Sequence, residues 1–106
     1  MSGGLHQIAC HLSALTPIER ELRADLASRV KSSIVSMREL ANGYVLTLNR
    51  EVTGRCVEDL VSLERRCCPF LRFRFALVLT GLKLEVTGPA GSKELLSQEF
   101  GLQDAG

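Results

Sequence analysis

Two adjacent cysteines, Cys67 and Cys68, lie in the stretch LERRCCPFLRF, where a predicted helix ends at a proline. Thiolates are the side chains that bind soft ions such as Hg(II), Cu(I), Zn(II) and As(III). Adjacent thiols point apart on a regular helix, but Pro69 permits local unwinding that would bring them together. The pair therefore indicates soft-ion binding, formation of a vicinal disulfide, or burial as two ordinary small core residues.

Polar residues gather on one side of this helix and apolar residues on the other, and Glu64 is the exception because it falls on the apolar side. It precedes Cys67 by three residues and Cys68 by four, so both thiols are its neighbours on the next turn. A carboxylate among apolar side chains is costly unless it is paired, protonated or bound to a metal. We therefore treat Glu64 as a candidate ligand. The alternative is that Glu64 lies at the edge of the core and pairs with Arg72 or Arg74.

Cys10 is the candidate third thiol. Alternation of apolar and polar residues over Ile8–Ser13 predicts a strand in which Cys10 points inward with Ile8 and Leu12. Three thiols would converge if this strand passes the end of the cysteine helix. Three thiols suit trigonal binding of a soft ion, and Glu64 would complete a tetrahedral zinc site.

The other possible ligands are weaker. Cys56 lies about 16 Å from Cys67 along the helix axis, at 1.5 Å per residue, and is expected in the core or at its edge. His11 points away from Cys10, and His6 lies in residues 1–6, where we expect a frayed start. No CxxC pair is present, so the signatures of zinc ribbons and thioredoxins are missing.

Composition predicts one domain spanning residues 1–106. With 45% hydrophobic residues, the chain has enough apolar material for a core without a disulfide framework. A net charge of +1 and few aromatic residues argue against a nucleic-acid partner. No apolar run approaches the roughly 20 residues of a membrane span, and no secretion signal is visible. We therefore expect a cytoplasmic protein whose four cysteines are thiols.

The first half of the chain is predicted to contain a helix and a hairpin after the initial strand. The helix begins at Thr16-Pro17-Ile18-Glu19, a capping box with proline at the first helical position. Its apolar residues recur at helical spacing: Ile18, Leu22, Leu26 and Val30. Strands over Ile34–Leu40 and Tyr44–Leu48 are joined by Asn42-Gly43, a strong hairpin signal.

The second half repeats the same order of elements. The cysteine helix runs from Thr53 or Gly54 to Cys68. A strand follows within Phe70–Leu79, and one face of it carries four apolar residues: Phe73, Phe75, Leu77 and Leu79. The last strand is formed by Leu82, Leu84 and Val86, and Ser92 is expected to cap a short final helix that Gly101 closes. The order β-α-β-β-α-β-β-α predicts an α+β fold, an antiparallel sheet with helices packed on one face.

These motifs resemble those of a family of small bacterial domains. The matching stretches are Ile8-Ala9-Cys10-His11-Leu12, Glu64-Arg65-Arg66-Cys67-Cys68-Pro69-Phe70 and Thr87-Gly88-Pro89. Domains of this family occur alone or fused to regulators of the mercury-resistance type. The resemblance implies heavy-metal handling in resistance or sensing, with Cys10, Glu64, Cys67 and Cys68 acting together.

Three functions remain open from the sequence. The first is a binding module, rather than an enzyme, for a soft metal or metalloid such as Hg, Cu(I), Zn or As. The second is a structural or protein-interaction domain with core cysteines, in which a homodimer could form through an exposed sheet edge. The third is a vicinal-dithiol redox protein, in which one thiolate attacks an oxidant or a disulfide and its neighbour resolves the product.

Overall fold

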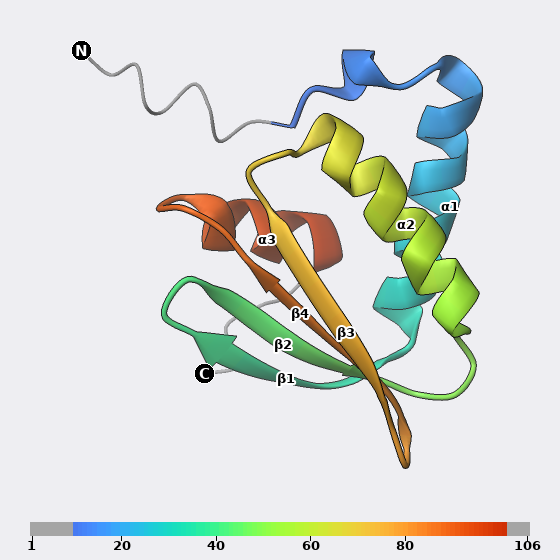
Figure 1. Cartoon of the computed structure of the whole chain (residues 1–106), viewed down its shortest axis with the longest axis vertical. Helices are drawn as coiled ribbons and strands as arrows, with labels where there is room; N and C mark the ends of the chain where they lie inside the picture. Colours follow the sequence, from blue (N-terminus) through green and yellow to red (C-terminus); the bar gives the residue numbers. More distant parts are fainter. Residues whose placement is uncertain (1–9, 102–106) are drawn as a thin grey trace.

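A computed structural model describes residues 10–101 and confirms the α+β class (Figure 1). A four-stranded antiparallel sheet carries three helices on one face. The elements in chain order are η2 (Leu12–Ala14), α1 (Pro17–Ser32), β1 (Ile34–Leu40), β2 (Gly43–Leu48), α2 (Gly54–Cys67), β3 (Arg72–Val78), β4 (Gly81–Thr87) and α3 (Ser92–Phe100). No helix within residues 10–101 is long and apolar enough to cross a bilayer.

The sheet has the strand order β1-β2-β4-β3. Strands β1 and β2 form one hairpin, β3 and β4 form the other, and the pairing of β2 with β4 joins the two hairpins. Leu46 pairs with Leu84 at its centre, and Phe73 pairs with Val86 nearby. Alternate residues of the central strands face the helices and are buried: Tyr44, Leu46, Leu48, Leu82, Leu84 and Val86. The two predicted hairpins and the burial of every second residue along the central strands are therefore confirmed.

Helix α1 begins as predicted. The Thr16 side chain accepts a hydrogen bond of 3.1 Å from the Glu19 backbone, and Glu19 accepts one of 2.9 Å from the Thr16 backbone. The apolar stripe is covered only over its second half, because Leu26 is buried whereas Ile18 is 78% exposed. Helix α1 packs against α2, which carries the two cysteines.

Helix α2 also has the expected ends. The Thr53 side chain accepts a hydrogen bond from the backbone of Cys56, and the helix closes when the Cys68 backbone donates to the Glu64 carbonyl at 2.6 Å. Its buried face carries four aliphatic residues together with Glu64 and Cys67: Val57, Leu60, Val61 and Leu63. The carboxyl of Glu64 is therefore part of the core.

Three local predictions differ from the structure. The predicted first strand is absent over its described part, where Leu12–Ala14 form a single 3-10 turn, while Ile8 lies outside the described residues. This segment crosses the end of α2, where the His11 backbone N–H donates a hydrogen bond of 2.7 Å to the Cys67 carbonyl. The second difference is the start of α3. Ser92, predicted to cap this helix, is its first helical residue and is buried, and Gly91 occupies the cap position.

The third difference concerns β3. Phe73 is buried on the predicted apolar face, but Leu77 and Leu79 are 81% and 89% exposed. The far end of the β3–β4 hairpin extends past the helices (Figure 1), so nothing in the described chain covers these side chains.

Candidate metal and redox site

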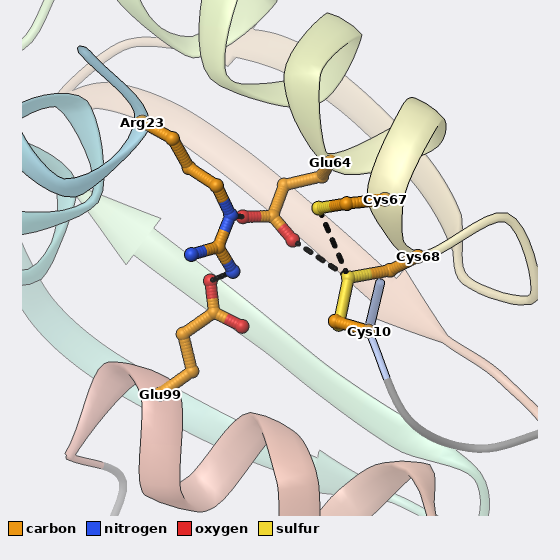
Figure 2. Close-up of a disulfide and its surroundings, with 6 residues drawn as sticks. All are labelled: Cys10, Arg23, Glu64, Cys67, Cys68 and Glu99. Atoms are coloured by element: carbon orange, nitrogen blue, oxygen red, sulfur yellow. Dashed lines mark hydrogen bonds and ion pairs between the residues drawn. A yellow bond between two sulfur atoms is a disulfide. The ribbon is translucent and has the colours of Figure 1, made fainter. Parts of the chain in front are cut away.

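The four residues singled out in the sequence meet at one end of α2. One ligand atom each of Cys10, Glu64, Cys67 and Cys68 lies within 4.8 Å of all the others. Glu64 and Cys67 come from the last turns of α2, Cys68 caps that helix, and Cys10 comes from the segment that crosses it (Figure 2). The predicted convergence of the sulfur atoms of Cys10, Cys67 and Cys68 with the Glu64 carboxyl is therefore present.

Cys10 and Cys68 are joined by a disulfide. Their Cα atoms are 4.5 Å apart, within the range that a disulfide requires, because the chain at Cys10 lies directly against the end of α2. The prediction that all four cysteines are thiols is wrong for this pair. The vicinal pairing of Cys67 with Cys68 is also not the one observed, since Cys68 bonds to a residue 58 positions earlier.

Cys67 remains a free thiol beside this disulfide. Its Sγ lies 3.5 Å from Sγ of Cys68, and its side chain is completely buried. Because Cys68 carries no sulfur-bound hydrogen in the disulfide, Cys67 is the donor in this contact. Burial raises the pKa of the Cys67 thiol, and the nearby Glu64 carboxyl raises it further. Cys67 is therefore held as a neutral thiol next to a bond it can attack once deprotonated.

Glu64 links the sulfur atoms to an ion-pair network. One carboxylate oxygen, Oε1, lies 3.4 Å from Cys68 Sγ, and the other lies 2.7 Å from Arg23 Nε. The Arg23 guanidinium also donates to Glu99 of α3 at 2.6 Å, so one cation is shared by two carboxyl groups (Figure 2). The contact between Arg23 and Glu64 has the geometry of an ion pair rather than of a directed hydrogen bond.

This network corrects the partner expected for Glu64. Arg72 and Arg74 are exposed, whereas Arg23 reaches Glu64 from α1. Arg23 was not among the predicted site residues, although Leu26 and Val30 follow it at helical spacing and are buried. This i, i+3, i+7 spacing places Arg23 on the buried side of the helix and could have identified it as a partner for a buried carboxylate.

Glu64 is only 1% exposed, and this burial raises the pKa of its carboxyl group. Burial, reinforced by the hydrogen bond and the charge of Glu99, raises its pKa from 4.5 to about 8. The attraction of Arg23 acts in the opposite direction and is the smaller effect. The cluster therefore places a carboxyl group with a raised pKa next to a disulfide and a thiol.

The weaker candidates lie elsewhere. Cys56 is a free thiol packed against the core near the start of α2, as expected for a core or edge residue. His11 is exposed, and His6 lies outside the described residues. Among the aromatic residues that follow the cysteines, Phe73 is buried and Phe70 is half-buried.

Comparison with known proteins adds no relative. No family model, no curated protein and no solved structure matches the chain.

Proposed function

We propose that the chain, once its disulfide is reduced, binds one soft metal or metalloid ion through Cys10, Cys67 and Cys68. The observation that carries this proposal is the convergence of three sulfur atoms and a Glu64 oxygen within 4.8 Å of one another. Free thiolates prefer soft ions over hard ones. Heavy-metal handling, which the resemblance of the sequence motifs implies, belongs to the same proposal.

The spacing of the ligand atoms fits an ion at their centre. A zinc–thiolate bond of about 2.3 Å in tetrahedral geometry separates two sulfur atoms by about 3.8 Å. Sγ of Cys67 and Sγ of Cys68 are already 3.5 Å apart. After reduction, only the sulfur of Cys10 has to move away from Cys68. Cys10 is half-buried and precedes the first turn, η2, so the residue that moves lies outside α2 and the sheet.

Reduction must come first, because a sulfur atom in a disulfide is not a thiolate ligand. Two molecules of a small thiol such as glutathione supply the two electrons and two protons. They leave as their own disulfide, and Cys10 and Cys68 become thiols. The site therefore binds an ion only in the reduced chain.

The test is native mass spectrometry of the reduced chain with Zn(II), Cu(I), Hg(II) or arsenite, each in the presence of excess glutathione. We expect one ion per chain, retained by the Cys56→Ser variant and lost from the Cys67→Ser and Cys68→Ser variants. Cys56 is the matched control because it is a half-buried free cysteine of the same helix. Absence of any retained ion, or full retention by both cluster variants, would refute the proposal.

A second function is favoured by one contact, the 3.5 Å between Cys67 Sγ and Cys68 Sγ. A Cys67 thiolate can attack Cys68 Sγ, form the Cys67–Cys68 bond, and release Cys10 as a thiolate that takes up a proton. The chain would then exchange disulfides as a redox protein. Disulfide mapping after thiol treatment tests this, because exchange produces a Cys67–Cys68 peptide. Recovery of the Cys10–Cys68 bond alone would exclude exchange.

A further inference from the structure

The charge around the sulfur atoms restricts which ion the cluster can hold. Three thiolates bring three negative charges into a site where Cys67 and Cys68 have no exposed surface. Among residues 10–101, Arg23 is the only cation in ion-pair contact with the cluster, and Glu64 and Glu99 already share it. A charge buried without a compensating partner is strongly unfavourable.

Arg66, which also interacts electrostatically with Cys67, does not change this balance. Arg66 precedes Cys67, but its guanidinium binds both carboxylate oxygens of Glu19 at 2.7 and 3.0 Å and the Ala14 carbonyl at 3.1 Å. Its side chain is 48% exposed, so water screens the remaining charge. The bound ion itself must therefore neutralise the three thiolates.

A monovalent ion on three thiolates leaves two negative charges in the core, and a divalent ion leaves one. Only a trivalent centre neutralises all three thiolates. We infer that the cluster takes a trivalent metalloid, supplied as a neutral trihydroxide such as arsenous acid, in preference to a monovalent or divalent cation. This inference depends on the proposed function, since it names the class of ligand for the same site.

The binding step balances without a redox partner. The three thiols of Cys10, Cys67 and Cys68 exchange with the three hydroxyl groups of As(OH)3. Three As–S bonds form, three As–O and three S–H bonds break, and three water molecules leave. Reactants and products are all neutral, so no charge has to enter the buried site. Binding of a divalent cation by all three sulfur atoms, in contrast, releases three thiol protons and leaves one net negative charge behind.

Coordination by three sulfur atoms also gives Glu64 a different role from the one it has in a zinc site. A trivalent metalloid needs only three ligands and keeps a lone pair in the fourth direction. Glu64 would then remain beside Cys68 Sγ, where Oε1 now lies at 3.4 Å, without joining the ion. A tetrahedral zinc site built from this cluster would need the Glu64 oxygen as its fourth ligand.

The experiment compares arsenite and Zn(II) on the reduced full chain under excess glutathione. We expect the wild type to gain the mass of one arsenic less three hydrogens and to retain no zinc. Glu64→Gln and Cys56→Ser should change the arsenite affinity by less than about threefold, whereas loss of a zinc ligand lowers zinc affinity by about tenfold or more. Cys67→Ser should abolish arsenite retention.

X-ray absorption at the arsenic edge supplies a second measurement on the wild type, which needs no variant to fold. Three sulfur neighbours and no oxygen are expected, and two or fewer sulfur neighbours would overturn the inference. Retention of Zn(II), Hg(II) or Cu(I) in place of arsenite would overturn the inference and leave the proposed function standing. Retention of no ion by a folded chain with four titratable thiols would refute both.

Discussion

The buried carboxyl of Glu64 should make the stability of the fold fall as the pH rises. Its pKa is raised from 4.5 to about 8, chiefly by burial and then by Glu99, against the smaller attraction of Arg23. Between these values the folded chain keeps a proton that the unfolded chain has released. The stabilisation is complete below pH 4.5 and is lost as the pH passes through about 8. The interval between these two values sets an upper limit of about 5 kcal/mol on the loss.

Glu64→Gln removes this titration while keeping the shape of the side chain. We expect the free energy of unfolding of the oxidised wild type to fall by several kcal/mol more than that of the variant between pH 5 and pH 8. The thiol of Cys67 faces the same site in both proteins, and its own pKa is raised above 9.0, outside this range. Urea unfolding measures the difference, because about 3 kcal/mol shifts the midpoint by about 2 M at a slope of about 1.5 kcal/mol/M.

Glu58→Gln is the matched control, since Glu58 is exposed on the same helix. It should leave the pH dependence of the wild type unchanged. Parallel curves of the unfolding free energy against pH for the wild type and Glu64→Gln would refute the reasoning, because they would show that Glu64 titrates alike in the folded and unfolded chains.

Three further predictions concern other parts of the chain. Iodoacetamide should alkylate half-buried Cys56 in the native oxidised protein at least about tenfold faster than fully buried Cys67, and equal rates would contradict the observed burial. The hydrogen bond from Arg66 is the largest of the effects that lower the pKa of Glu19 from 4.5 to about 2. The stability of the wild type should therefore fall as the pH drops from 4.5 to about 2, and Glu19→Gln should reduce this fall, as measured by thermal unfolding. Leu46→Ala, at a core position 1% exposed, should lower the free energy of unfolding by about 2 to 5 kcal/mol in urea, and a loss below about 1 kcal/mol would contradict its placement.

The elements of the fold were largely predictable because their signals are local. The capping box at Thr16 and Glu19 and the Asn42-Gly43 turn each act within four residues, and both appear where expected. The strand predicted across Cys10 was wrong because a short alternating run does not show whether a neighbouring strand is available to pair with it. Likewise, the exposure of Leu77 depends on how far the helices extend over the sheet.

The sequence by itself determined that Glu64, Cys67 and Cys68 form one cluster, because the helical repeat places residues three and four apart on adjacent turns. It also identified Cys10 as the third thiol. Only the tertiary structure decided that Cys10 bonds to Cys68 and that Arg23 is the partner of Glu64. These contacts join segments distant along the chain, so they depend on how α1 and the segment before it pack against α2, which no local spacing specifies.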